Sequence, residues 1–428
     1  MTDTADVPVL FNPFEPGFFD DPYAQYRRVR AAEPVHRTPL DVWMLFRYED
    51  CFSLLRDPST SVEMAKAWEI NPGARQERME QMRALLPEMD EEPRQNRSIL
   101  NVDPPDHTRL RKLLSKVFTP RRVEDLRPKV RQLVDEHLDA VAERGEMDVI
   151  ADLAFPLPFT VISEMLGMPD ADRDQLRAWS HTGVRLLDPI LAPDQIRESL
   201  QAMQHMFEHC AEVIAWKRAN PADDLLTALI DAEEDGETLS PEELQDQVVL
   251  LFIAGHETTV NLIGNGTRAL LAHPDQQARL RDDPSLDAAA VDELLRFDSP
   301  VQFSRRIVLR DVEIGGQQIE AGTFVMTCLG AANHDPEQFG PDADALDLGR
   351  EGAGRHLSFG SGIHHCLGAA LARLEGQEAI GRLVRRFPDL APASEASAWN
   401  GRIVLRGLDE LPVRFTPTGG AADPGATS

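Results

Sequence analysis

Apolar residues recur every three or four positions over most of the chain, the spacing that gives a helix one apolar face. The longest such segment covers residues 241–271. Ser240 and Glu243 have the spacing of a capping box, and Pro241 occupies the first helical position. At ~1.5 Å per residue, ~31 residues span ~47 Å. A helix of that length with the apolar middle VVLLFIAG is predicted to cross the core of one large domain.

The remaining pattern predicts a mainly α protein with a small β portion. Helices are expected over residues 48–56, 108–118, 123–143, 158–166, 171–187, 193–217, 287–297 and 367–386. Strands are expected at 402–405 and 412–415, in a hairpin joining 35–37 to 42–46, and in a hairpin within 308–318 around Gly315-Gly316. One domain over 11–415 is expected between a mobile N-terminus (1–10) and a disordered tail (416–428).

Two segments show no clear helix or strand pattern. Residues 59–98 are polar, rich in Met and weakly patterned, and residues 333–354 are rich in Asp, Gly and Pro. The second segment is predicted to be a long coil, and long ordered coils in compact proteins are often functional.

Charge and cysteine content narrow the function classes. The 428 residues include 44 Lys or Arg and 72 Asp or Glu, a net charge of −28. That charge disfavours non-specific nucleic-acid binding and binding to anionic membranes. Four scattered cysteines do not form a disulfide framework. The N-terminal sequence has no signal-peptide pattern, so a cytoplasmic protein is expected.

The strongest chemical signal is FGSGIHHCLG at residues 359–368. Glycines permit tight turns and close approach to a flat ligand. Cys366 directly precedes a predicted helix, whose N-terminus lowers the pKa of a thiol and favours the thiolate. Two alternatives remain: an inert buried thiol, the commoner fate of a lone cysteine, or a small-metal site using His364, His365 and Cys366, which adjacent residues form with difficulty.

The segment resembles the haem-binding loop of the cytochrome P-450 family, Phe-Gly-x-Gly-x-His-x-Cys-x-Gly, at every fixed position. The resemblance extends over residues 12–415 and is greatest to soluble bacterial members. It implies the cytochrome P-450 fold and haem b (iron protoporphyrin IX) with Cys366 as the axial thiolate that binds the metal. It also implies that Phe359, Gly360 and Gly368 belong to the cofactor-binding loop.

A second motif, AGHETT, occupies residues 254–259 in the middle of the long helix. Ala254, Gly255 and Thr258 lie on nearly one face, and Gly255 would let a flat ligand approach the backbone. An acid in an apolar stretch needs a partner or a function. The alternative is a solvated face with a threonine that bonds to its own helical turn. The resemblance implies that Thr258 hydrogen-bonds iron-bound dioxygen and that Glu257 relays protons.

Basic residues suggest how the haem is held. His107 and Arg111 share a helix face and could clamp an anion. The resemblance assigns them to the haem propionates, together with Arg306 and His364, although Arg305 is an alternative to Arg306.

Residues 107–131 carry nine Lys or Arg against two acids. They form either a docking patch for an acidic electron donor, a ferredoxin by resemblance, or a basic face balanced by acidic neighbours.

Glu293 and Arg296 are spaced to pair on one helix face. The resemblance makes them a buried structural pair, often completed by an arginine from the coil before the haem loop. The corresponding segment here, PDADAL at 341–346, has no arginine. The third partner is therefore absent or replaced.

The predicted function is a cytochrome P-450 monooxygenase that inserts one oxygen atom of O2 into a small apolar organic substrate: a secondary metabolite, a terpene or steroid, or a lipid. By resemblance, electrons come from a ferredoxin and an NAD(P)H-fed ferredoxin reductase. The enzyme is expected to be a monomer, with residues 63–99 and 186–206 roofing the pocket. The alternatives are a peroxide-driven haem peroxygenase, which typically lacks the acid and alcohol of residues 257 and 258, and a non-catalytic haem carrier or sensor.

Overall fold

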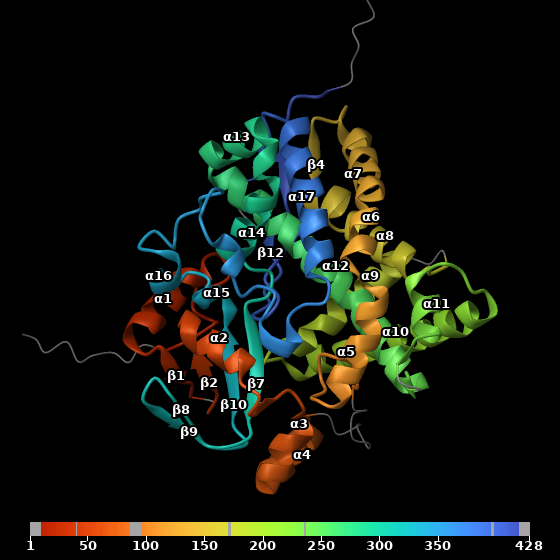
Figure 1. Ribbon diagram of the computed structural model, residues 1–428. Coiled ribbons are helices and arrows are strands. Elements are labelled where there is room, and N and C mark those ends of the chain that lie inside the picture. The colour runs from red at the N-terminus through yellow and green to blue at the C-terminus, as the bar shows by residue number, and fades with distance from the viewer. Residues whose placement is uncertain are drawn as a thin grey trace, which may run out of the picture.

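The computed structural model describes residues 10–39, 41–85, 96–169, 173–234, 237–394 and 398–418. Most of the expected mobile N-terminus, and the expected tail beyond residue 418, lie outside these ranges. Figure 1 shows a helical region beside a smaller region that contains the main sheet.

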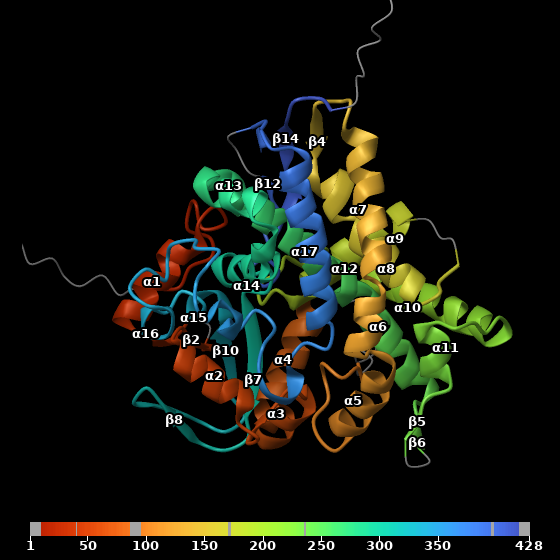
Figure 2. The same ribbon diagram turned by 45° about the horizontal axis from the view of Figure 1, so that its top comes forward.

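Helix α12 (Pro241–Ala272) runs through the middle of the molecule, which confirms the predicted core-spanning helix (Figure 2). Its capping box is formed: Glu243 N donates to Ser240 Oγ at 3.1 Å, and Ser240 N donates to Glu243 Oε2 at 3.0 Å. It packs against α8 (Pro156–Met165), α10 (Pro193–Ala219), α14 (Asp287–Phe297) and α17 (Ala369–Arg386). It is long and apolar enough to cross a membrane, but 72% of its most apolar window is buried in the protein.

The other expected helices form with local differences. α2 (Tyr48–Arg56) and α14 have the predicted bounds, and α5 (Asp106–Val117) nearly so. The expected helix 123–143 is two helices, α6 (Pro120–Asp125) and α7 (Arg127–Val141), because Pro128 begins a new first turn. The expected helix 171–187 is α9 (Arg173–Gly183) followed by a 3₁₀ turn at Val184–Leu187, and residues 171 and 172 lie outside the described ranges.

Several helices were not predicted, some because the apolar face is narrow and others because the helix has only four to six residues. α13 (Pro274–Asp282), for example, buries only Leu280. The others are α1 (Pro22–Ala32), α3 (Met64–Ile70), α4 (Pro72–Leu85), α11 (Leu225–Ile230), α15 (Leu329–Ala332) and α16 (Pro336–Phe339). The segment 333–354 is otherwise irregular, as predicted.

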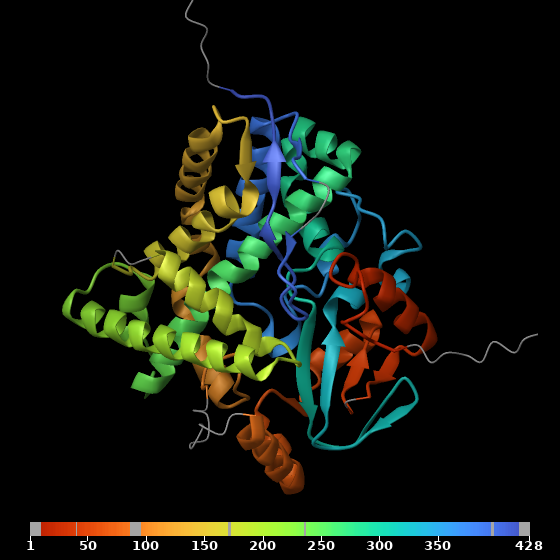
Figure 3. The same cartoon turned by 180° about the vertical axis from the view of Figure 1, so that it is seen from behind.

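The main sheet has the strand order β1 (Val35–Arg37), β2 (Trp43–Leu45), β10 (Phe324–Cys328), β7 (Phe303–Val308) and β3 (Thr60–Ser61). The β1–β2 hairpin is confirmed, and so is the hairpin of β8 (Val312–Ile314) and β9 (Gln317–Ile319). Figure 3 shows β7 and β10 side by side beneath the helices.

The remaining strands are short. β14 (Pro412–Arg414) confirms the strand expected at 412–415 and pairs with β4 (Glu146–Asp148) and β11 (Ala391–Pro392). The other pairs are β5 (Glu233–Glu234) with β6 (Glu237–Thr238), and β12 (Ala398–Trp399) with β13 (Leu408–Glu410). The strand predicted at 402–405 is wrong: only Leu405 forms an isolated bridge, with Val301, and the segment folds inward toward α12.

Candidate functional site

The loop before α17 presents Cys366. Cys366 N donates to Phe359 O at 2.9 Å, which closes the loop on itself. Gly360 and Gly362 have φ of 67° and 71°, in the left-handed region that glycine favours. A Cβ at Gly362 would lie 2.6 Å from Leu55 O at the end of α2. The glycines therefore fix both the loop shape and its contact with α2.

Cys366 differs from the other three cysteines, all of which lie in the described ranges. Cys51, Cys210 and Cys328 are buried, whereas Cys366 is exposed. Because Cys366 is accessible, the alternative of an inert buried thiol describes the other three cysteines instead.

The helix end does not lower the pKa of Cys366 as predicted. The dense surroundings of the thiol raise its pKa, and the N–H of Gly368 together with Arg111 and Arg373 offset only part of that rise. A bound metal cation would offset this rise and favour the thiolate.

Basic side chains from three elements converge near this loop. His107 comes from α5, Arg306 from β7, and His364 from the loop itself. The His107 and His364 rings are 4.4 Å apart. Burial, then Arg306 and His107, lower the pKa of His364 to about 3, so its ring is neutral at neutral pH. His107 Nε2 is buried and has no hydrogen-bond partner.

The two arginines of this cluster have no hydrogen-bonded carboxylate within the described ranges, although the charge of Asp103, which pairs with Lys66, acts on Arg306. Arg306 is 5% exposed and donates to Ser304 Oγ and Arg305 O. Its burial lowers its pKa to about 10. Arg111 Nη1 donates to His365 O at 2.8 Å. Across the described ranges, no carboxylate hydrogen-bonds to Arg306 or Arg111, so the cluster is built for an external anion.

The position of each arginine on β7 shows which of Arg305 and Arg306 lies in the basic cluster. Arg305 is exposed, whereas Arg306 is buried, because successive side chains of a strand point to opposite faces. The strand therefore brings Arg306, not Arg305, into the basic cluster.

The middle of α12 is locally open. Ala254 is exposed and Thr258 is half-buried in a helix that is otherwise mostly buried. Thr258 Oγ1 donates to Ala254 O at 2.8 Å, the bond to its own turn that the sequence allowed. A Cβ at Gly255 would lie 3.0 Å from Ile162 Cγ1, so this glycine accommodates the approach of α8. That a flat ligand also approaches Gly255 stays a prediction.

Glu257 is buried in a polar network. Ser180 Oγ donates to its Oε1 at 3.0 Å, and Arg402 Nη1 lies 3.5 Å from its Oε2. Burial alone would raise the pKa of Glu257, but His256, Arg402 and His181 outweigh it and hold the pKa at about 2. Glu257 is therefore ionised at neutral pH. No sequence pattern indicates Ser180 or Arg402 as its partners.

Comparison with known proteins decides the family. The family profile described as Cytochrome P450 matches residues 47–396. The chain belongs to the cytochrome P450 family. It is 46% identical to Cytochrome P450 107B1 of Saccharopolyspora erythraea over 96% of this chain and 99% of that protein. It is 41% identical to the Vitamin D(3) 25-hydroxylase of Pseudonocardia autotrophica, over 94% and 96% of the two chains.

A solved structure agrees. The myxobacterial cytochrome P450 CYP267B1 in complex with myristic acid has a TM-score of 0.83 and 40% sequence identity, covering 94% of this chain and 98% of that one. The protein is a P450 monooxygenase, and membership implies haem held by a cysteine thiolate. The residues fit that group: one accessible cysteine, a buried His107 Nε2 without a hydrogen-bond partner, and two arginines that hydrogen-bond no carboxylate of the described residues suit an iron porphyrin with two propionates.

The structure identifies the third partner of Glu293 and Arg296, which the sequence left undetermined. Arg296 is fully buried and makes a bidentate pair with Glu293 at 2.7 and 2.8 Å. Arg350, four residues beyond the segment 341–346, lies 3.2 Å from Glu293 Oε1 and is the third partner. The family's buried pair is thus complete in this P450, with the arginine placed later in the coil.

The basic stretch 107–131 is partly balanced by acidic neighbours. Ion pairs join Arg109 to Glu243, Arg127 to Glu124 and Glu378, Lys129 to Glu164, and Arg131 to Glu378. Lys112, Lys116, Arg121 and Arg122 are exposed on α5 and α6. We call these four residues the basic surface.

Proposed function

We propose that this P450 inserts one oxygen atom of O2 into an apolar organic substrate at a haem b held by Cys366. The observation that carries the proposal is the convergence of an accessible cysteine with His107, Arg111, Arg306 and His364, where no carboxylate of the described residues hydrogen-bonds to either arginine. In this proposal, His107, Arg111, Arg306 and His364 bind the haem propionates, and Phe359, Gly360 and Gly368 shape the loop behind the iron.

The bound haem would supply the activation of O2, as thiolate-ligated haem does in this family. The chain supplies positioning and protons. Ala254, Gly255 and Thr258 would border the oxygen-binding side of the haem, where the Thr258 hydroxyl, which donates to Ala254 O, would pass on a proton. Glu257, held as an anion, would accept a proton at its carboxylate and pass it toward Thr258.

The substrate is proposed to be a moderately large apolar molecule such as a secondary metabolite, a steroid or a lipid. The relatives support this size class, since one is named a vitamin D(3) 25-hydroxylase and another holds myristic acid. α3, α4 and the start of α10 are proposed as its roof, although residues 86–95 of the expected roof lie outside the described ranges.

The electron donor is proposed to be a ferredoxin that docks on the basic surface and is reduced by an NAD(P)H-fed reductase. Arg111, on the same helix as Lys112 and Lys116, contacts His365 O beside Cys366, so a donor bound there would approach the thiolate side. The protein is proposed to work in the cytoplasm as a monomer.

The proposal is tested with the haem-loaded protein. Reduction under carbon monoxide should give the long-wavelength Soret maximum of a thiolate ligand, and Cys366→Ser should abolish it while Cys210→Ala keeps it. Thr258→Ala should release more hydrogen peroxide per O2 consumed. A Cys366→Ser protein with an unchanged spectrum would overturn the ligand assignment, and full coupling in Thr258→Ala would overturn the role of Thr258.

A further inference from the structure

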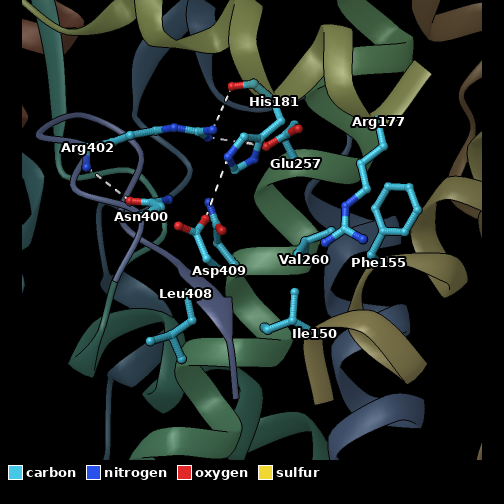
Figure 4. Close-up of a pocket in the computed structure, with 11 residues that line it drawn as sticks. Ile150, Phe155, Arg177, His181, Glu257, Val260, Asn400, Arg402, Leu408 and Asp409 are labelled. Carbon is cyan, nitrogen blue, oxygen red and sulfur yellow. Dashed lines mark hydrogen bonds and ion pairs between the residues drawn. The ribbon is translucent and has the colours of Figure 1, made fainter. Parts of the chain in front are cut away.

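A small cavity adjoins the carboxylate of Glu257, on which the proposed function places proton transfer (Figure 4). Its volume is about 30 Å³, room for about two water molecules. Ile150, Leu408 and Val260 form an apolar side. The polar side consists of His181, Asn261, Asn400, Arg402 and Asp409.

Two buried donors on the polar side have no hydrogen-bond partner. They are Arg402 Nε and Asn261 Nδ2, and the two residues are 5% and 4% exposed. A buried donor without a partner is costly, and ordered water is the usual remedy in a polar cavity with sufficient room. The cavity therefore has room for about as many water molecules as there are buried donors without a partner.

The cavity lies between Glu257 and solvent. Figure 4 shows Arg402 beside both Glu257 and His181, with its Nη2 donating to His181 O at 2.6 Å. His181 Nε2 lies 3.6 Å from Asp409 Oδ1. The exposed fractions of the side chains rise outward, from 10% for Glu257 to 38% for His181 and 49% for Asp409. His181, Asp409 and Glu257 all line this cavity, so water inside it would link the partly exposed mouth to the buried carboxylate.

We propose that this cavity holds ordered water that conducts protons from the His181–Asp409 mouth to the carboxylate of Glu257. A proton moves along O–H and N–H hydrogen bonds: each water accepts one proton and releases another, and Glu257 receives the last. His181 and Asp409 take up protons, and Arg402 is a positioning residue that fixes both the carboxylate and the mouth. The inference rests on the proposed role of Glu257.

His181 is surrounded by charges of both signs. Arg402 and Arg185 disfavour its protonation, Glu257 and Asp409 favour it, and Arg177 faces the same cavity. Neutralising Asp409 removes one of the two acids and leaves the arginines in place. Proton uptake in Asp409→Asn should therefore weaken most at high pH, where protons are scarce.

The first test is occupancy. A high-resolution crystal structure of the haem-loaded protein should show water within hydrogen-bond distance of Arg402 Nε and Asn261 Nδ2. A dry cavity would overturn the proposal without any reference to turnover.

The second test uses His181→Gln and Asp409→Asn, with His205→Gln and Glu410→Gln as controls that change a histidine and neutralise an acid outside the network. Myristic acid is the probe substrate, with NADH, a ferredoxin and its reductase. Both test variants should turn over several-fold more slowly, with a larger solvent deuterium isotope effect and an unchanged carbon monoxide spectrum, and the slowing in Asp409→Asn should grow as pH rises.

Glu257→Gln distinguishes an error in the proposed cavity route from an error in the proposed role of Glu257. If it is impaired while His181→Gln and Asp409→Asn behave as wild type, the cavity route is wrong and the role of Glu257 stands. If Glu257→Gln is also unimpaired, the proposed relay itself is wrong.

Discussion

Arg350 Nε lies 3.2 Å from Glu293 Oε1, although 57 residues separate the two in the chain. Arg350 also donates to Phe339 O at 2.9 Å and to Ala345 O at 3.1 Å, so it ties the irregular coil to α14. The side chains of Arg350 and Glu293 are 6% and 0% exposed. The coil before the haem loop is therefore held by buried charge rather than by regular secondary structure.

Arg350→Ala should lower the free energy of unfolding by about 3 kcal/mol, because Glu293 loses one of its two buried arginine partners and the carbonyl groups of Phe339 and Ala345 lose a charged donor. Urea unfolding of the haem-loaded protein, followed by tryptophan fluorescence, measures the change. Arg279→Ala is the control, since Arg279 pairs with Asp347 in the same coil but the two side chains are 45% and 44% exposed. It should cost less than about 1 kcal/mol. Equal losses in the two variants would contradict the structural role of Arg350.

The sequence predicted those parts of the fold and site whose signals are local. The capping box and apolar run of α12 lie within one segment, and so do the ten residues of the Cys366 loop. β7 and β10 were not predicted because strands at the centre of a sheet lack clean alternation: β7 reads FSRRIV and buries four of its six residues. Their neighbours β2 and β3 lie more than 200 residues away in the chain.

The sequence also could not predict contacts between residues that lie far apart in the chain and meet only in the fold. Arg402 reaches Glu257 across 145 residues, and no spacing rule links the two. The error at 402–405 has the same origin: the apolar Ile403, Val404 and Leu405 suggested a strand, whereas they are buried in a non-strand segment that delivers Arg402 to α12.

Glu375 should make the stability of the protein fall as pH rises. It is fully buried on α17, and burial raises its pKa from 4.5 to about 8. Below about pH 4.5, Glu375 is protonated in both folded and unfolded chains and has no effect. Between about 4.5 and about 8 the folded chain keeps a proton that the unfolded chain has lost, so the free energy of unfolding falls by about 1.4 kcal/mol per pH unit.

Glu375→Gln should remove this dependence. Its free energy of unfolding should match that of wild type near pH 4.5 and exceed it at pH 8, as measured by urea unfolding across this range. Glu378→Gln on the same helix is the control with the opposite sign, because Glu378 pairs with Arg127 and Arg131 and its loss should destabilise the protein at pH 8. A Glu375→Gln protein no more stable than wild type at pH 8 would show that the carboxyl is not desolvated.

Arg306 should hold haem far more strongly than Arg305. Arg306 is buried beside His364, and Arg305 is exposed on the other face of β7. A charge-assisted hydrogen bond contributes about 1.5–3 kcal/mol, so Arg306→Gln should release haem to excess apomyoglobin roughly 10- to 100-fold faster. Arg305→Gln should release it at the wild-type rate. The reverse order would assign the propionate to Arg305.

The basic surface should govern the encounter with the electron donor. Lys112, Lys116, Arg121 and Arg122 are exposed in a protein whose net charge is −28, so they offer an acidic ferredoxin a local attraction against a repulsive background. Arg121→Glu combined with Arg122→Glu should raise the KM for ferredoxin about tenfold at low salt, and the difference should shrink as salt screens the charges. Arg310→Glu, at an exposed arginine between β7 and β8, is the matched control and should leave the KM unchanged. An unchanged KM in the double variant at low salt would move the donor site away from α5 and α6.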